Sequence, residues 1–368
     1  MTDYLPGAIT WIQGRASMLR DKLASNDNPD PLRGVLDAQV ANLDTTLEQI
    51  RNRLTDRSLR DETFADQHLA SYRGWVRLVA VVEQHFLMLC DLWRNDEDDM
   101  QGVLEQICAE TGMPPSIRPV IALHGAQYSV MTGTGIIYAP RMERHFLLHL
   151  PDLYHEIGHL LVEEKAAILW GTARTAIQNH FSLLIREGTV QGDPMAQDGT
   201  YRRMYDYWGQ AWLIELTCDA IATFLCGPAY AWAHLHLCAS HDSGIYVGHE
   251  SHPADHARQE LIAMVLDRLG ETEQRGHFAD RWDSFAQTLG QRRPASYASA
   301  YPDALLGLVV QEVHDGLLSL GLTIYDGAAP DAESTAALLN TAWEEFWRSP
   351  TEYREWEETA RGQLRRAS

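Results

Sequence analysis

The run His155-Glu156-Ile157-Gly158-His159 constrains this chain more than any other feature. On a helix, residues four positions apart lie on one face, so both imidazoles can reach one metal ion at about 2.0–2.1 Å. Glu156 lies roughly 100° round the helix, where its carboxylate can address a metal-bound water. The spacing predicts a zinc-binding helix with Glu156 as general base; the alternative is that the two histidines are ordinary helix residues.

The residues around this motif predict a buried, rigid helix. Pro151 suits the first helical position, and Asp152 complements the positive end of the helix dipole. Gly158 costs about 1 kcal/mol of helix propensity relative to alanine, which indicates that another backbone or a substrate approaches closely there. Apolar residues recur at helical spacing in the same segment: Leu153, Ile157, Leu160 and Leu161.

A third ligand is expected, because a catalytic zinc usually takes three protein ligands and keeps the fourth position for water. Residues 208–222 form a largely apolar helical segment with two acids one turn apart, Glu215 and Asp219. Buried carboxylates are costly unless they are paired. Both carboxylates would be paired if Glu215 bound zinc and Asp219 accepted a hydrogen bond from the second ring nitrogen of a ligand histidine. The alternative is that the two acids pair with arginines on a solvated face.

A third motif runs from His252 through Pro253 to Arg258, at the predicted entrance of a helix. A histidine or arginine here could stabilise the oxyanion that forms when water attacks a polarised carbonyl. Capping or surface roles are the simpler alternative for His252, since histidines are common in this part of the chain. A second metal site built from His252 and His256 is a further alternative.

Together the three motifs resemble those of gluzincin metallopeptidases, most closely the CAAX-prenyl endopeptidase and heat-shock membrane protease group, over residues 119–265. The resemblance implies a zincin-like core and a Zn²⁺ cofactor. By this resemblance, the zinc ligands are His155, His159 and Glu215, and the general base is Glu156. Asp219 lies behind the ligands. His252 and Arg258 contact substrate or orient Glu215.

Members of that group are typically embedded in membranes, and this chain departs from them. It has no run of about 18 or more uninterrupted apolar residues. The most apolar candidate, residues 218–239, contains Asp219 and two histidines, and it is better interpreted as buried helices broken at Gly227-Pro228. No membrane span is expected, and prenylated substrates are not implied.

Three short β-prone runs precede the motif helix, at residues 120–123, 127–131 and 135–139, and they suggest a small meander. The last run ends at Pro140, as an edge strand can. An extended peptide could add to that edge through the substrate-binding residues Ile136, Ile137 and Tyr138. The alternative is that the strands are only a packing layer.

The predicted fold class is mainly α (α+β), with this small sheet before the zinc helix and helical regions on either side. The predicted domains are an N-terminal helical bundle at 1–110, a zincin-like catalytic core at 111–265 and a helical region at 266–368. The N-terminal bundle is either a support or a lid or pro-segment. The aromatic stretch from Trp343 to Trp356 is either an ordinary packed helix or a partner surface.

Charge and cysteine usage limit the partners. The 51 Asp and Glu outnumber the 30 Lys and Arg, and the net charge of −21 disfavours nonspecific binding to nucleic acid or anionic lipid. The N-terminus lacks a secretory signal pattern, so a cytoplasmic protein is expected. No two cysteines form a C-x-x-C pair, and all five are expected to be reduced: Cys90, Cys108, Cys218, Cys226 and Cys238.

The sequence therefore predicts a zinc metallopeptidase that hydrolyses a protein or peptide substrate through a zinc-bound water activated by Glu156. A non-catalytic zinc-containing peptide-binding or regulatory module is the alternative, although a structural zinc usually has four protein ligands. A processing protease or toxin with one protein target is a second alternative. The pattern leaves cleavage preference, endopeptidase or exopeptidase action and oligomeric state open.

Overall fold

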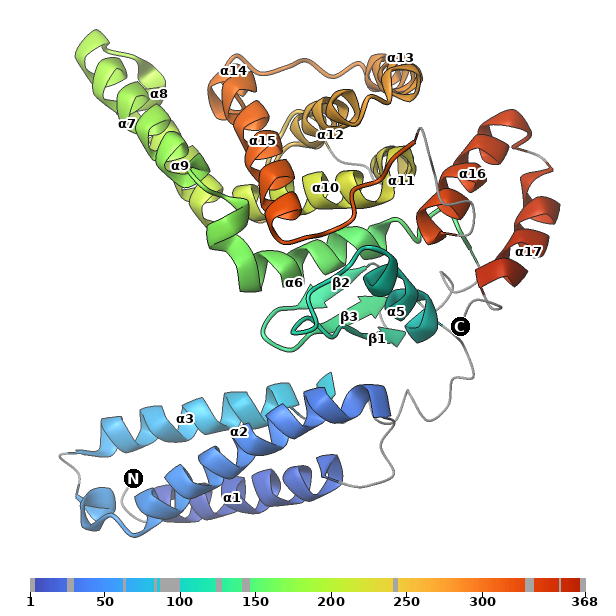
Figure 1. Ribbon diagram of the computed structural model, residues 1–368. Coiled ribbons are helices and arrows are strands. Elements are labelled where there is room, and N and C mark those ends of the chain that lie inside the picture. Colours follow the sequence, from blue (N-terminus) through green and yellow to red (C-terminus); the bar gives the residue numbers. More distant parts are fainter. Residues whose placement is uncertain are drawn as a thin grey trace. The chain divides into compact units, whose positions relative to one another are not determined.

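The computed structural model describes residues 4–24, 30–61, 64–82, 85–86, 100–123, 128–140, 146–240, 244–327, 334–350 and 352–364. Within these residues the chain is mainly helical with one three-stranded sheet, which confirms the predicted mainly α class (Figure 1). The chain folds as two compact units, Met1–Asp98 and Asp99–Ser368. Helix α5 (Met100–Glu110) belongs to the second unit, whereas the domain bounds predicted from the sequence place residues 100–110 in the N-terminal bundle.

In the first unit, helices α1 (Tyr4–Leu23), α2 (Asp30–Leu54) and α3 (Ala65–Val82) pack pairwise against one another. The 3₁₀ helix η1 (Arg57–Arg60) follows α2 and contacts α1 and α3. Each helix buries an apolar stripe at helical spacing, which explains why the three associate. The buried residues include Ile9, Ile12, Leu19, Leu36, Leu43, Leu47, Ile50, Trp75 and Val79.

The sheet of the second unit comprises β1 (Val120–Leu123), β2 (Ser129–Met131) and β3 (Ile136–Ala139), in the order β1-β3-β2. Strand β3 pairs parallel to β1 and antiparallel to β2. The predicted meander is wrong, because a meander would place β2 in the centre. Only β2 and β3 form a hairpin, and the turn between them contains Gly133 and Gly135 at φ 79° and 73°.

The expectation that the third strand is an edge strand is also wrong. Strand β3 lies between the other two, so its backbone is paired on both sides. Ile136 and Ile137 are fully buried, and Tyr138 is half-buried. These three residues therefore cannot accept an added peptide strand through their backbone; within the described residues, the outer strands of the sheet are β1 and β2.

Helix α10 (Leu213–Cys226) is the centre of the second unit. It packs on α6 (Asp152–Leu169) and also contacts α12 (Asp255–Leu269) and α15 (Asp303–Ser319), and Figure 1 shows it between α6 and α12. All of its residues except Ile214 are buried. A helix covered on every side has no solvated face, so any charged side chain that it carries needs a partner inside the protein.

The predicted break at Gly227-Pro228 is confirmed. Helix α10 ends at Cys226, and α11 (Pro228–Ser240) begins at the proline. Gly227 has φ 74° and ψ −152°, a conformation that strongly favours glycine. Among the described helices, none combines the length and the apolar composition that crossing a membrane requires.

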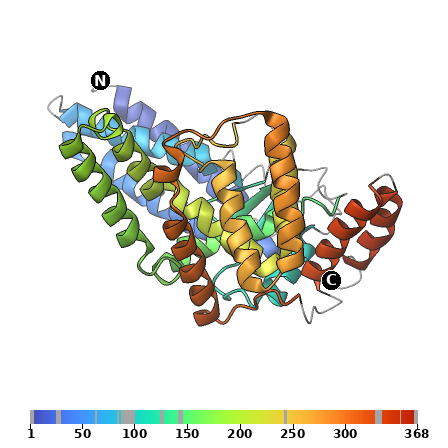
Figure 2. The same cartoon turned by 90° about the horizontal axis from the view of Figure 1, so that it is seen from above.

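The remaining helices surround this centre. Helices α12 and α13 run side by side in Figure 2, and α16 and α17 form a pair in which Trp343 and Tyr353 are buried. The aromatic stretch is therefore at least partly an ordinary packed region. The bounds of the other helices are α7 (Ala173–Gln191), α8 (Pro194–Gln197), α9 (Thr200–Tyr207), α13 (Thr272–Leu289), α14 (Tyr297–Ala300), α16 (Thr335–Arg348) and α17 (Tyr353–Leu364).

Candidate metal centre

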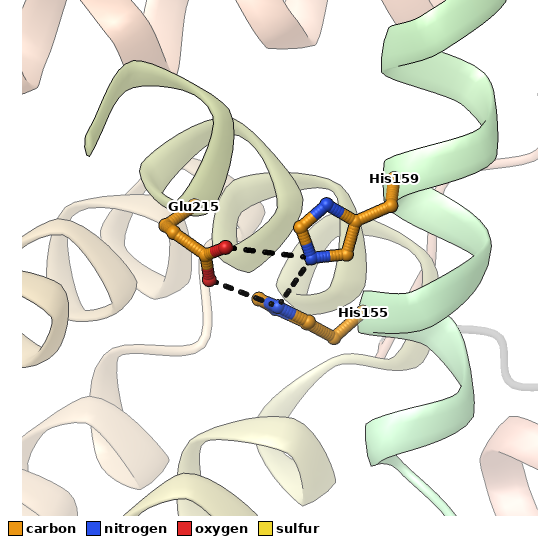
Figure 3. Close-up of side chains that lie close together, drawn as sticks. All are labelled: His155, His159 and Glu215. Carbon is orange, nitrogen blue, oxygen red and sulfur yellow. Dashed lines mark hydrogen bonds and ion pairs between the residues drawn. The ribbon is translucent and has the colours of Figure 1, made fainter. Parts of the chain in front are cut away.

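Helices α6 and α10 bring three potential ligands together. His155 and His159 lie one turn apart on α6, and Glu215 faces them from the first turn of α10 (Figure 3). The two Nε2 atoms are 3.2 Å apart. Glu215 Oε2 lies 3.4 Å from His155 Nε2, and Oε1 lies 3.6 Å from His159 Nε2. A tetrahedral ion bound at 2.0–2.1 Å would separate such atoms by about 3.4 Å, so this trio could hold a metal ion.

Gly158 explains how the two helices approach closely enough. A Cβ atom at this position would lie 3.2 Å from Cys218 Cα and 3.3 Å from Cys218 Cβ, both on α10. The expectation that another backbone approaches Gly158 is confirmed, and that backbone is the helix that carries Glu215. The glycine therefore sets the spacing between the histidines and the glutamate.

Asp219 lies behind the trio. Its Oδ1 is 3.0 Å from Nδ1 of His155, the ring nitrogen that faces away from Glu215, and the side chain is fully buried. Arg258 donates to both oxygens of Asp219, from Nε to Oδ2 and from NH2 to Oδ1, each at 2.7 Å. This bidentate pair neutralises the buried carboxylate and fixes the direction in which it meets the imidazole.

The structure places Arg258 differently from the sequence expectation. The resemblance suggests that Arg258 contacts substrate or orients Glu215, but the residue is 7% exposed and its guanidinium is paired with Asp219. The alternative interpretation, in which the two acids pair with arginines on a solvated face, holds only for the ion pair between Asp219 and Arg258. That pair is buried and not solvated. Arg258 supports His155 from behind through Asp219.

His252 lies at the exposed side of the trio. Its Nε2 is 3.8 Å from Glu215 Oε2, and 56% of its side chain is exposed. His256 lies elsewhere: its Nδ1 accepts a hydrogen bond of 2.7 Å from Trp282 Nε1, and its Nε2 is 3.2 Å from Glu260 Oε1. The metal-ligating clusters found among the described residues do not include a pair of His252 and His256.

Tyr230 of α11 is a site residue that sequence reasoning missed. Its hydroxyl donates to Asp219 Oδ1 at 2.5 Å and lies 3.0 Å from His155 Nδ1. The side chain is 1% exposed. A buried tyrosine hydroxyl usually finds a hydrogen-bond partner, but no motif spacing connects this residue with His155 or Asp219.

A π-helical turn, η5 (Trp208–Trp212), precedes α10 and was also missed. The segment was predicted as one continuous helix; π-turns often lie next to functional sites. Trp212 Nε1 donates to the carbonyl of His249 at 2.6 Å, and the Trp212 ring stacks on Tyr301. These contacts attach the loop before His252 to the start of α10, and they hold His252 beside Glu215.

The charges of the trio are coupled. Burial lowers the pKa of His155, but hydrogen bonds to Asp219 and Glu215 outweigh burial and raise it to about 10. Burial raises the pKa of Glu215, whereas His155 and Arg258 lower it to a net value of about 2. Burial and the nearby His155 lower the pKa of His159 to about 4. The protonated form of His155 is thus stabilised between Glu215 and Asp219. A metal ion bound to His155 would replace the proton that faces Glu215.

Glu156 follows His155 on α6 and is 6% exposed. Burial raises the pKa of its carboxyl group to about 7. A carboxyl group with a pKa near neutrality can both accept and return a proton, which is what a general acid–base residue needs.

No protein-family model, curated protein or solved structure matches this chain. The resemblance to gluzincins therefore stays a prediction from three motifs. The geometry of α6 and α10 adds an independent observation: the two histidines and Glu215, far apart in the sequence, form one largely buried cluster with the spacing of metal ligands.

Proposed function

We propose that this protein is a zinc-dependent metallopeptidase in which His155, His159 and Glu215 bind Zn²⁺ and Glu156 is the general base. The observation that carries the proposal is the convergence of these three ligands, with donor atoms 3.2–3.6 Å apart, on helices that meet at Gly158. Two imidazoles and a carboxylate form a donor set typical of catalytic zinc, because they leave one coordination position open.

Bound in this trio, Zn²⁺ would supply a Lewis acid that polarises the peptide carbonyl and lowers the pKa of water. The protein's own residues handle the protons. Glu156 takes a proton from the attacking water and passes it to the amine that leaves when the C–N bond breaks, so the products are a carboxylic acid and an amine. His252, exposed beside Glu215, can donate a hydrogen bond to the oxyanion.

The residues behind the trio keep one imidazole in a single orientation. Asp219 meets His155 at its Nδ1, while Arg258 and Tyr230 fix Asp219. This arrangement favours the tautomer of His155 that presents Nε2 to the metal. A catalytic site needs such an arrangement, because its metal ligands must have the same geometry in every turnover.

The test is hydrolysis of a mixture of unlabelled peptides and unfolded proteins, read by mass spectrometry, for the zinc-loaded wild type and two variants. Glu156→Gln should keep the zinc content of the wild type and lose turnover by about 10²–10⁴-fold. Glu164→Gln, which changes an exposed acid on the same helix, is the matched control and should leave both unchanged.

Full activity of Glu156→Gln would contradict the proposal. A zinc-loaded wild type that retains peptides but cuts none of them would favour a non-catalytic peptide-binding module. Cleavage of one protein and of no generic peptide would point to a processing protease with a narrow target.

A further inference from the structure

A second buried cluster of ligating side chains lies between α11 and α12. His234 and Cys238 are one turn apart on α11, and Asp255 and Gln259 are one turn apart on α12. The two helices pack against each other, so each places a pair of polar side chains on the shared interface. These four residues form no recognisable motif in the sequence.

The distances within this cluster fit a metal ion. One donor atom each from His234, Cys238 and Asp255 lies within 4.8 Å of the other two. Nδ1 of His234 is 3.6 Å from Sγ of Cys238. An ion bound tetrahedrally to nitrogen at 2.0–2.1 Å and to sulfur at 2.3 Å would separate the two atoms by about 3.6 Å.

The cluster is buried, and its hydrogen bonding is incomplete. His234, Cys238 and Gln259 are 1%, 5% and 2% exposed, and Asp255 is half-buried. Within the described part of the chain, Oε1 of Gln259 is buried without a hydrogen-bond partner. Such an atom in a folded core calls for an explanation, and a bound ion or water is the usual one.

Gln259 is placed to complete the coordination. Its Nε2 is 2.5 Å from His234 Nδ1, and the Cys238 thiol interacts with the same amide. A half-turn of the amide exchanges its oxygen and nitrogen, and this brings the unpartnered Oε1 towards the histidine and the cysteine. To bind the same tetrahedral ion as His234 Nδ1, this oxygen must also move away from Nδ1 by about 0.8 Å, to a separation of about 3.3 Å. The cluster then offers one nitrogen, one sulfur and two oxygens to a single centre.

Charge and donor type indicate which ion this centre would take. A thiolate and a carboxylate together carry two negative charges, so a divalent cation leaves the buried centre neutral. Thiolate and imidazole ligands favour zinc over magnesium or calcium, which take oxygen ligands. We propose that His234, Cys238 and Asp255 bind a second Zn²⁺, with Gln259 as the fourth ligand.

This second centre is structural, because the protein supplies all four ligands and no coordination position stays open for water. It joins α11 to α12, the helices that carry Tyr230 and Arg258. Both of those residues bind Asp219 behind His155. The second ion therefore stabilises the support of the first centre, and it does so whether or not the first centre is catalytic.

The experiment uses Co²⁺ as the probe, added to the chelator-treated full-length protein. Thiolate ligation of Co²⁺ gives a charge-transfer absorption, and the trio of His155, His159 and Glu215 contains no sulfur. The bound stoichiometry and this absorption together therefore report the two centres separately. The thermal midpoint is measured on the same samples.

We expect the wild type to bind two Co²⁺ with the charge-transfer absorption. Cys238→Ala should bind one ion and lack the charge-transfer absorption. Glu215→Ala should also bind one ion but show this absorption. Cys108→Ala is the matched control, since it removes a free thiol on α5 that belongs to neither cluster, and it should bind two Co²⁺ with the charge-transfer absorption.

Two results would overturn the second centre: a wild type that shows no charge-transfer absorption, or a Cys238→Ala variant that still binds two ions. If circular dichroism shows that Cys238→Ala does not fold, Asp255→Asn decides, because it keeps the thiol and the side-chain shape. That variant should bind the second ion at least tenfold more weakly, and an unchanged affinity would contradict the assignment. Loss of the first ion alone would bear only on the proposed peptidase site.

Discussion

Both clusters have the same local arrangement, in which each of two packed helices carries a pair of polar side chains one turn apart. They differ in the residues that surround these pairs. The α6–α10 trio has Glu156 as the neighbour of its first histidine and the exposed His252 at its side. In the α11–α12 cluster, Gln259 is placed to close the proposed centre. Helix spacing alone thus assembles ligands, and the surrounding residues distinguish an open centre from a closed one.

The two clusters also differ in how they are held. Asp219, Arg258 and Tyr230 form a buried network behind His155. In the second cluster the His234 imidazole contacts Gln259 and Cys238, and its other nitrogen has no partner within the described residues. We therefore expect the first centre to keep its geometry without metal, whereas the second centre depends on the ion itself.

The largest expected effect comes from breaking the network. Asp219→Ala leaves the Arg258 charge buried without its partner, so it should destabilise the protein by about 3–5 kcal/mol. The affinity of the trio for zinc should fall by about 10–100-fold, because His155 loses its orientation. Urea denaturation and zinc titration measure the two effects. Asp198→Ala, an exposed acid in a turn, is the control; equal losses in both variants would mean that the network has no special role.

A smaller effect is expected for Tyr230→Phe, which removes one hydrogen bond to the buried Asp219 carboxylate. The expected loss is about 1.5–3 kcal/mol, with weaker zinc binding by the trio. Tyr154→Phe is a matched control, because the Tyr154 hydroxyl is buried and has no hydrogen-bond partner among the residues that the structure describes. Chemical denaturation should separate the two variants clearly, and a Tyr230→Phe protein as stable as the control would remove Tyr230 from the network.

Gly158→Ala tests the contact that brings α6 and α10 together. The added Cβ would meet Cys218 at 3.2–3.3 Å, so the helices must separate by a few tenths of an ångström. We expect a net cost of about 1 kcal/mol after the gain in helix propensity, together with weaker zinc binding. Gly276→Ala on α13 has open space around its Cβ and should stabilise by about 0.5–1 kcal/mol. A stabilised Gly158→Ala protein with native zinc affinity would show that the spacing is not critical.

The last effect is confined to acidic solution and concerns a histidine pair outside both clusters. Burial, with the nearby His236, lowers the pKa of His149 to about 4, below the value of about 6.5 in an unfolded chain. The unfolded state then binds more protons between these pH values, so stability is lost as the pH falls from about 6.5 towards 4. His149→Gln should reduce this loss by about 1–2 kcal/mol, allowing for the partial exposure of the ring. Denaturation midpoints across that range check it; an unchanged slope would contradict the assignment.

The parts of the first centre that could be predicted are the parts set by local spacing. His155 and His159, and Glu215 and Asp219, are one-turn pairs, and the Gly227-Pro228 break is a local backbone preference. Each of these follows from three or four neighbouring residues. Their meeting in one cluster depended on the resemblance between motifs, and the structure supports it with the distances in Figure 3.

The parts that were missed or wrong depend on contacts between distant segments. The pairing of β3 with both neighbours follows from a parallel connection that strand propensity does not specify. Arg258 pairs with Asp219 rather than Glu215, and Tyr230 reaches the same carboxylate from α11, because of how α11 and α12 pack on α10. His234 and Cys238 show no motif until Asp255 and Gln259 face them from another helix.

The central claim is that α6 and α10 together bind a metal ion through His155, His159 and Glu215. Elemental analysis of purified wild type and Glu215→Ala, with Glu164→Ala as the exposed control, tests it most directly. We predict that Glu215→Ala holds one equivalent of zinc fewer than the wild type and that the control holds the same amount. Equal zinc in all three proteins would contradict the claim and leave the HExxH helix without a role in metal binding.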